Sequence, residues 1–262
     1  MGISIQKNNI LVRIHTFRCN MKAIHLFIVG ILILSGCAQK PKAPNRKYNH
    51  LANKVQSTNI KPHQHIEVAK PSSTSELTPS EIFERYSPAV FKIHTSTGYQ
   101  GFQGSGFFIS DDGLAVSNYH VFRGTTVGYE TIILSDGSTY KVTDVYYKDS
   151  ENDFIIFRVG INHKISYIKI ANITPKIGEK VYTIGSPRGL DNTFSSGEIS
   201  QIRDNGNILQ ISAPIDHGSS GGVLLNSYGE AIGITSGGID DSGANLNYAI
   251  NIKMIKPYIP KQ

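Results

Sequence analysis

The sequence is poor in cysteine, and this absence limits how the protein can be stabilised. Only two cysteines, Cys19 and Cys37, occur in 262 residues, and both lie near the N-terminus. Everything after Cys37 is cysteine-free, so no disulfide framework can hold that part of the chain together. Hydrophobic residues make up 39% of the chain and there are 25 glycines. We therefore expect a packed hydrophobic core with frequent turns.

The N-terminal apolar run is too short to cross a membrane comfortably. It covers residues 23–34, whereas a spanning helix needs about 20 apolar residues. This length is typical of a signal-peptide core, and Lys22 precedes it. Leu34-Ser35-Gly36-Cys37 follows the run directly. Small residues before a cysteine at this place resemble the lipobox of bacterial lipoproteins.

The lipobox resemblance implies that residues 1–36 are a signal peptide and that Cys37 becomes the lipidated N-terminus. Met21 followed by Lys22 looks like a natural start, so we interpret residues 1–20 as a possible mis-assigned start. Ala38 rather than Asp after the cysteine favours the outer membrane, facing the periplasm, in a double-membraned bacterium. The alternative is an uncleaved anchor followed by an incidental cysteine.

Excess positive charge is missing from most of the chain, although the net charge is +6. Residues 1–37 hold four Lys/Arg and no acids, and residues 38–77 hold seven Lys/Arg and two acids. Residues 78–262 hold fifteen Lys/Arg and eighteen acids, so this part is mildly acidic. The distribution argues against a nucleic-acid-binding domain and fits a basic segment near an anionic surface.

Residues 37–77 are expected to form a flexible basic tether after the lipidated cysteine. The stretch is polar, contains proline and shows no apolar periodicity. Its His63 and His65 lack cysteine or carboxylate support, so we assign no metal site to them. No motif for a metal, nucleotide or organic cofactor is present, and we expect none.

The domain that carries the chemistry is expected over residues 78–262. Thr78, Pro79 and Glu81 have the spacing of a capping box, which predicts a short helix ending before Pro88. Strand 89–94 follows, and a closing helix is expected at 253–259. Between them, β-prone runs separated by turns predict two packed antiparallel barrels or a large sandwich. These runs are 102–109, 113–118, 129–134, 139–147, 154–159, 165–170, 180–184, 194–202, 207–212, 222–226, 230–236 and 246–251.

Three segments carry residues of the types used in nucleophilic catalysis. They are Gly104-Ser105-Gly106-Phe107 with Ser117-Asn118-Tyr119-His120-Val121, then Asn152-Asp153-Phe154-Ile155, then Gly218-Ser219-Ser220-Gly221-Gly222. In this order and with these separations they resemble the trypsin-like serine proteases, in particular the Do-like (HtrA) branch. The resemblance covers residues 78–262. It implies an all-β fold of two six-stranded antiparallel barrels with short N- and C-terminal helices.

The resemblance also implies roles for individual residues. Ser220 would be the nucleophile, His120 the base that activates it, and Asp153 the group that orients the imidazole. The N–H groups of Gly218 and Ser220 would form the oxyanion hole. No cofactor is needed for this chemistry, and the expected substrates are proteins or peptides.

The substrate-binding residues implied by the resemblance lie on two segments. Pro214, Ile215 and Leu246 fall near the pocket for the residue before the cleaved bond, and they are apolar. Thr235, Ser236 and Gly237 match the strand that lines the substrate cleft, where Ser236 would support Asp153. Asp240 and Asp241 lie on a nearby loop and are interpreted as solvated acids. We therefore expect a preference for small or medium apolar residues.

The match departs from the branch in ways that leave a second function open. Ser219 replaces the usual Asn or Asp beside the nucleophile, and Val223 replaces a frequent Pro. No segment for the branch's peptide-binding PDZ domain follows the protease region, so we expect none. A chaperone or binding module on the same fold is therefore the alternative to an envelope-anchored serine endopeptidase. The oligomeric state is left open.

Overall fold

The computed structural model of the protein describes residues 73–98, 101–186, 192–239 and 246–260. The expected signal peptide, Cys37, the tether before residue 73 and the acidic pair 240–241 lie outside the described residues. In the described part, no helix combines the length and the apolar character needed to cross a membrane.

The described chain is built mainly from antiparallel strands, with a few short helical segments. Its helical elements are α1 (Pro79–Tyr86), α2 (Tyr119–Phe122) and the 3-10 turns η1 (Ser87–Ala89), η3 (Asp204–Gly206), η5 (Ile252–Met254) and η6 (Lys256–Tyr258). Its strands are β1 (Val90–Ser96), β2 (Gly101–Phe108), β3 (Leu114–Ser117), β4 (Thr131–Ile133), β5 (Thr139–Tyr140), β6 (Val142–Asp149), β7 (Phe154–Val159), β8 (Lys180–Gly185), β9 (Thr193–Arg203), β10 (Ile208–Ile211), β11 (Val223–Leu225), β12 (Ala231–Ile239) and β13 (Leu246–Asn251).

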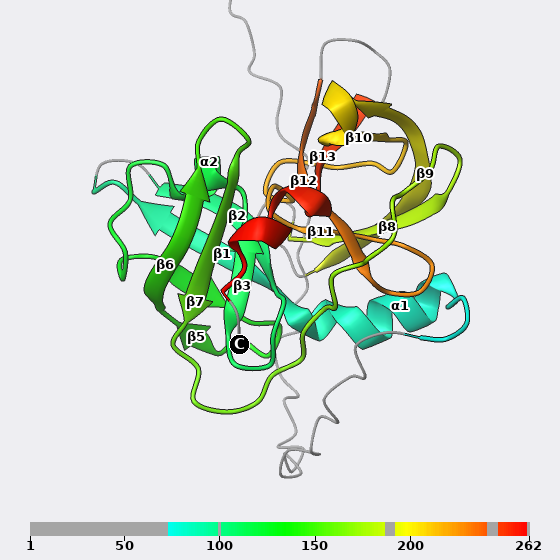
Figure 1. The fold of residues 1–262 in the computed structure, drawn as a ribbon. Coiled ribbons are helices and arrows are strands. Elements are labelled where there is room, and N and C mark those ends of the chain that lie inside the picture. Colours follow the sequence, from blue (N-terminus) through cyan, green and yellow to red (C-terminus); the bar gives the residue numbers. More distant parts are fainter. Residues whose placement is uncertain (1–72, 99–100, 187–191, 240–245, 261–262) are drawn as a thin grey trace, which may run out of the picture. The chain divides into compact units, whose positions relative to one another are not determined.

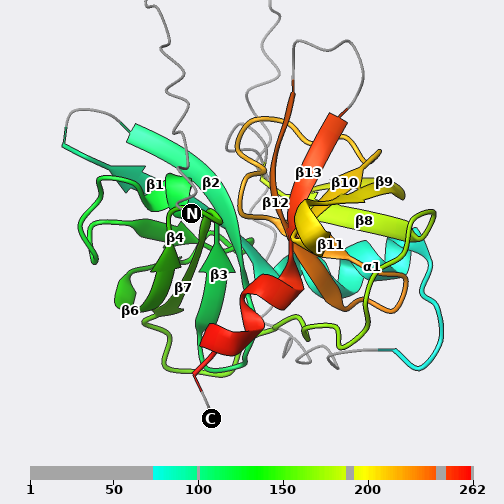
Figure 2. The same cartoon turned by 45° about the horizontal axis from the view of Figure 1, so that its top comes forward.

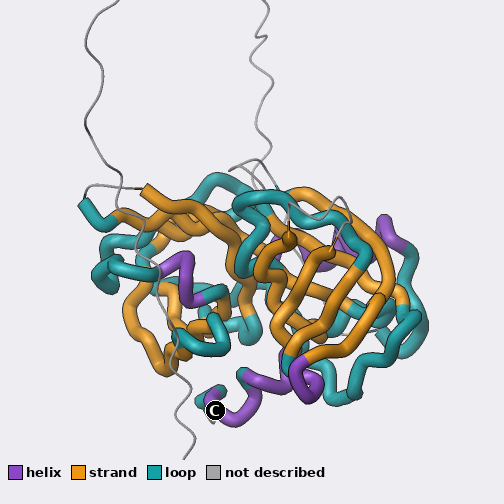
Figure 3. Tube along the Cα trace, turned by 90° about the horizontal axis from the view of Figure 1, so that it is seen from above, coloured by secondary structure: helices purple, strands orange, loops and turns teal. Residues whose placement is uncertain are grey.

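The strands form two antiparallel sheets that follow one another along the chain (Figure 1). The first is a seven-stranded half-barrel in the order β5-β4-β1-β2-β3-β7-β6. The second is a closed barrel in the order β10-β13-β12-β11-β8-β9. Seen from above, the strands gather in two groups joined by loops (Figure 3). The two-barrel architecture expected from the sequence is confirmed, with the first barrel left open.

Helix α1 begins where the capping box predicted it. The Glu81 N–H donates to the Thr78 hydroxyl, and the Glu81 carboxylate accepts from the Thr78 N–H at 2.8 Å. The Thr78 hydroxyl also donates to this carboxylate, and the two bonds from the Thr78 N–H and hydroxyl lower the pKa of Glu81, so the carboxylate stays charged in mild acid. The helix buries Ile82 and Tyr86 on its inner face.

Three apolar clusters hold the described chain together. One fills the first sheet, around Phe91, Phe108 and Phe157, and a second fills the closed barrel, around Leu209 and Leu224. The third lies between the two sheets. It joins α1 to strands of both sheets and to the C-terminal turns, and it includes Tyr86, Phe107, Phe154, Tyr182, Val223 and Ile255. This layer supplies the stabilisation that disulfides cannot supply here.

The C-terminal turns also connect the two sheets (Figure 2). They leave β13 of the closed barrel, and Tyr258 at their end stacks on Tyr147 of β6 with ring centroids 3.7 Å apart. A hydrogen bond to Tyr258 raises the pKa of Tyr147 to about 12. The aromatic contact thus fixes the end of the described chain on the first sheet.

Two expected elements differ from the structure. Residues 165–170 were expected as a strand, but they are irregular apart from one bridge between Ile170 and Ala231. Ile165 and Ile168 are buried there, so their apolar character comes from packing along a connection rather than from sheet pairing. The closing helix is instead the pair of 3-10 turns η5 and η6, with Pro257 inside the second.

Candidate active site

His120 and Asp153 are brought together by the pairing of two neighbouring strands. Strand β3 ends at Ser117 and β7 begins at Phe154, and their antiparallel register places Ser117 opposite Ile155. His120 follows the end of β3 and Asp153 precedes the start of β7. Both residues therefore lie at the same end of this strand pair.

The two side chains are directly hydrogen-bonded. His120 Nδ1 lies 2.8 Å from Asp153 Oδ2, and the His120 backbone N–H donates to Asp153 Oδ1 at 2.8 Å. The Asp153 backbone carbonyl accepts from Asn118 Nδ2 at 3.0 Å. The Ser236 hydroxyl from the second barrel donates to Asp153 Oδ2 at 3.1 Å. With its Nδ1 proton directed at the carboxylate, a neutral His120 presents Nε2 as an acceptor.

The turn before β7 holds Asp153 in an unusual backbone conformation. Its φ is 56°, in the left-handed region that aspartate tolerates better than most residues. Asp149 stabilises this turn, because its carboxylate accepts the N–H groups of Glu151 and Asn152 and the Asn152 side-chain amide. Burial opposes ionisation of Asp149, but these hydrogen bonds outweigh it and lower the pKa of Asp149.

Ser220 lies in the loop just before β11, beside the strand that carries Ser236. The register pairs Val223 with Ile234, so Ser220 and Ser236 extend beyond the same end of the β11–β12 pair. The Ser220 hydroxyl donates to the Ser236 backbone carbonyl at 3.1 Å. Within the described residues, no hydrogen bond joins Ser220 to His120.

The loop before Ser220 is a tight turn with two unbonded N–H groups. The Ser219 N–H donates to the Asp216 carbonyl at 3.0 Å, and Gly218 has φ 94°, as the third position of a type II turn requires. In the described part of the chain, the N–H groups of Gly218 and Ser220 donate to no acceptor. These two N–H groups belong to the residues on either side of Ser219.

Gly221 is required by close packing behind Ser220. Its φ is 87°, and a Cβ there would lie 2.1 Å from the Ser105 carbonyl oxygen. Any side chain would push the Ser220 loop away from β2. The residue type therefore follows from the contact between the two sheets.

A cleft of about 520 Å³ opens over His120 and Ser220. Of the predicted substrate-binding residues, Ile215, Ser236 and Gly237 line it. Beyond Ile234, β12 pairs only with β13 among the described strands, so its other edge faces this cleft. The full lining is His120, Ile215, Asp216, His217, Ser220, Ser236, Gly237 and Gly238.

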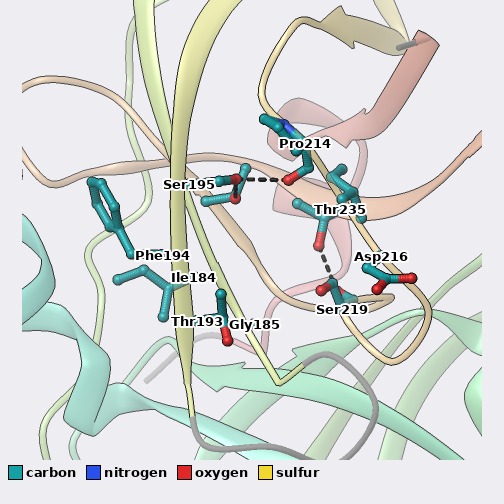
Figure 4. Close-up of a pocket in the computed structure, with 11 residues that line it drawn as sticks. Ile184, Gly185, Thr193, Phe194, Ser195, Pro214, Asp216, Ser219 and Thr235 are labelled. Carbon is teal, nitrogen blue, oxygen red and sulfur yellow. Dashed lines mark hydrogen bonds between the residues drawn. The ribbon is translucent and has the colours of Figure 1, made fainter.

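A second pocket of about 430 Å³ lies behind the Ser220 loop (Figure 4). Pro214 and Thr235, predicted as substrate-binding, line this pocket and not the cleft. Side chains alternate along β12, so Thr235 points away from the cleft that Ser236 faces. The Thr235 hydroxyl donates to the Ser219 carbonyl at 2.7 Å and thus supports the loop. Leu246 is half-buried and lines neither pocket.

Comparison with known proteins adds to this geometry. The family described as "Trypsin-like peptidase domain" matches residues 104–234 of the 262, and these residues include all three motif segments. The chain belongs to this family.

Relatives of this chain come from bacteria, insects and plants. It is 36% identical over 157 residues to a probable periplasmic serine endoprotease, DegP-like, of Rhizobium meliloti, covering 57% of this chain and 31% of the relative. It is 30% identical over 211 residues to the chloroplastic Protease Do-like 1 of Arabidopsis thaliana, covering 71% and 47%. The chain therefore spans about a third to a half of the length of these curated relatives.

Solved structures of serine proteases are also similar to this chain. The crystal structure of a serine endoprotease from Yersinia pestis matches with a TM-score of 0.62 and 26% identity, covering 70% of this chain and 65% of that one. An HtrA-type protease variant solved with a tripeptide matches with a TM-score of 0.60 and 25% identity, covering 68% and 61%.

Two residues of this peptidase domain contribute to the site without having been predicted. Asp149 supports the turn that carries Asp153, and its signal was an Asp three residues before an Asn, a spacing typical of a side-chain-stabilised turn. Ser105 is part of the first motif segment but had no predicted role, and its hydroxyl donates to the Gly218 carbonyl. The described residues contain no group of three or more His, Cys, Asp or Glu placed to hold a metal ion.

Replacing Asp149 with Ala should loosen the turn that holds Asp153. Loss of the three acceptor bonds exposes the His120 and Tyr119 amides, which bond to Asp153. We expect their amide hydrogen exchange, corrected for intrinsic rates, to accelerate by about tenfold or more. Mass-spectrometric exchange on the full chain measures this. Asp136→Ala, which removes a similar cap from the β4–β5 turn, is the control and should leave both amides unchanged.

The same carboxylate gives a pH dependence. Because the folded-state pKa of Asp149 is lowered, its stabilisation is present above the unfolded-state pKa and is lost as pH falls through the lower folded-state pKa. The protection of the Tyr119 and His120 amides against hydrogen exchange should therefore persist in mild acid. It should fall only when the pH drops below the usual range of aspartate pKa values. Equal protection in the parent and Asp149→Ala at neutral pH would contradict the assignment.

Proposed function

We propose that the protein is a serine endopeptidase that uses His120, Asp153 and Ser220 as a catalytic triad. The observation that carries the proposal is that His120 and Ser220 line the same cleft, while His120 is bonded to Asp153 through Nδ1. Membership of the trypsin-like peptidase family supports it.

In the proposed reaction, Ser220 Oγ attacks the carbonyl carbon of the scissile peptide bond. His120 Nε2 takes the hydroxyl proton, while Asp153 keeps Nδ1–H oriented and stabilises the imidazolium. His120 then gives this proton to the leaving amine, and an acyl-enzyme remains on Ser220. Water, deprotonated by His120, attacks the ester and releases the second product.

The turn at Gly218 supports the step in which negative charge develops on the carbonyl oxygen of the scissile bond. The unbonded N–H groups of Gly218 and Ser220 would donate to the oxyanion of the tetrahedral intermediate. Each such donor contributes about 3 kcal/mol of transition-state stabilisation in enzymes of this kind. Because the turn is already formed, little reorganisation is needed when the substrate arrives.

Substrate would add to β12 as an extended strand. The edge of β12 over Ser236–Gly238 faces the cleft beside Ser220 and lacks a strand partner in the described residues. Backbone hydrogen bonds to such an edge bind peptides irrespective of sequence. This arrangement suits unfolded or extended segments of protein substrates.

A binding module on the same fold is the second candidate function. One observation favours it: the Ser220 hydroxyl donates to the Ser236 carbonyl rather than to His120. Catalysis then requires this hydroxyl to turn towards His120 when substrate binds. In many enzymes the hydrogen bond between the nucleophile and its base is long or absent in the free protein and forms only in the substrate complex. The endopeptidase therefore remains the better interpretation.

Labelling of Ser220 separates the two functions. A fluorophosphonate probe should react with the purified full chain but not with Ser220→Ala, and casein cleavage should fall by at least about a thousandfold in that variant. The two proteins should have closely similar melting temperatures, because the half-buried Ser220 side chain makes a single neutral hydrogen bond, to the Ser236 carbonyl. A folded parent that neither labels nor cleaves casein would favour the binding module.

We propose that the residue before the cleaved bond is small or medium and apolar. Ile215 lines the cleft next to Ser220, and the opposite wall is the bare backbone of Gly237 and Gly238. Asp216 also lines it, but its carboxylate accepts the His217 N–H at 2.7 Å and is thus already engaged.

A panel of peptides that differ only at this residue tests the preference. Alanine and valine should give kcat/KM at least about tenfold above lysine and glutamate, because a charged side chain would lose hydration against Ile215. The same panel with Asp216→Asn should keep this order. A preference for lysine that disappears in Asp216→Asn would show that the carboxylate selects the substrate.

We further propose that the protein acts in the bacterial envelope, attached through a lipid on Cys37. The lipobox-like segment before Cys37 and the periplasmic location named for the Rhizobium relative support this. In a bacterial host, the parent should incorporate labelled palmitate and sediment with membranes. Cys37→Ser should do neither, with Cys19→Ser as the matched control. Equal incorporation in both variants would rule out Cys37 as the anchor.

A further inference from the structure

Ser105 makes an unusual set of contacts for a strand residue. It lies in β2 of the first sheet and is completely buried. Its hydroxyl donates to the Gly218 carbonyl at 2.8 Å, and its N–H donates to the Ser220 carbonyl at 2.7 Å. One residue of the first sheet therefore bonds the backbone of both oxyanion-loop residues.

The direction of the Ser105 hydroxyl is set by a third bond. The Ser186 N–H, at the end of β8, donates to Ser105 Oγ at 2.9 Å. A hydroxyl has one proton, so with an N–H already directed at its oxygen it gives that proton to Gly218. The Ser186 hydroxyl in turn bonds Asn192, which bonds the carbonyls of Ser87 and Val90. The contact is thus part of a network that spans both sheets.

These bonds determine which groups of the loop remain free. The Gly218 and Ser220 carbonyls are held by Ser105, and the Ser219 carbonyl accepts from Thr235 and Gly222. The Ser219 N–H is bonded to Asp216. With all three carbonyls held on the inner side, the N–H groups of Gly218 and Ser220 are left for the cleft.

We propose that Ser105 is a positioning residue of the oxyanion hole, acting through the hydrogen bond from its hydroxyl to the Gly218 carbonyl. The proposal rests on the serine endopeptidase function proposed above. Ser105 does not touch substrate. It fixes the Gly218–Ser219 peptide and thereby the adjacent Gly218 N–H, which would otherwise be free to turn with the flexible backbone of a glycine.

The substitution Ser105→Ala isolates this effect. It leaves the Gly218 carbonyl and the Ser186 N–H buried without their partner, and the loop can recover a bond only by rotating the Gly218 peptide. We expect kcat to fall about 10- to 100-fold while KM changes less than about twofold, because the lost interaction is made in the transition state. The His120–Asp153 bond is untouched, so the midpoint of the pH profile of kcat/KM should not move.

A peptide boronate gives a readout that general destabilisation does not move. Its tetrahedral adduct with Ser220 places an oxygen in the oxyanion hole, so Ser105→Ala should weaken its inhibition by the same factor as kcat/KM. Ser110→Ala is the matched control. Ser110 also carries a buried hydroxyl, in the turn between β2 and β3, where it is bonded to Asp112 and Leu114 and lies away from the Ser220 loop. It should lower the melting temperature with no change in kcat or boronate affinity.

The experiment uses the full chain of the parent, Ser220→Ala, Ser105→Ala and Ser110→Ala. Parent turnover that is absent in Ser220→Ala establishes the protease, so a failed proposal about Ser105 is distinguishable from a failed function. Unchanged kcat in Ser105→Ala, or a loss matched by Ser110→Ala, would overturn the positioning role. If Ser105→Ala does not fold, Ser105→Cys retains a weak donor. It should lower kcat by a smaller factor and again leave KM nearly unchanged.

Discussion

The apolar layer between the two sheets is the interaction on which the site depends. His120 and Asp153 come from the first sheet, whereas Ser220 and Ser236 come from the second. Their distances are therefore set by how Tyr86, Phe107, Phe154 and Tyr182 pack between the sheets. Buried aromatic side chains of this kind remove some 150–250 Å² each from water. This layer positions the site in a region that has no cysteine.

Hydrogen bonds across this layer fix the positions of the site residues more precisely than apolar packing alone can. Hydrophobic contacts are non-directional, but a catalytic site needs its groups placed to within about 0.5 Å. The bonds from Ser236 to Asp153 and from Ser105 to Gly218 both cross from one sheet to the other. Each couples a side chain of one sheet to a group that the proposed chemistry uses in the other.

The sequence was informative where a local rule decides the structure. The capping box predicted α1, and the resemblance carried by the ordered motifs implied that His120 and Asp153 meet, as their hydrogen bond shows. It was less informative where packing decides. Ile165 and Ile168 looked like strand residues, yet they are buried along a connection. Thr235 looked like a cleft residue, but it lines the pocket behind the loop, where its hydroxyl donates to the Ser219 carbonyl. The role of the Ser105 hydroxyl gave no signal, because the partners of that hydroxyl lie more than 80 residues away.

Ser236 shows how the resting site relates to the working one. Its hydroxyl holds Asp153, while its carbonyl accepts from the Ser220 hydroxyl. Exchanging one neutral hydrogen bond for another costs only about 1 kcal/mol, and a peptide added to the β12 edge changes the surroundings of this same carbonyl. Substrate binding and release of the nucleophile would then be coupled through one backbone group. The resting bond to Ser236 is therefore compatible with an active enzyme, since turning a hydroxyl about one bond is far easier than rebuilding a loop.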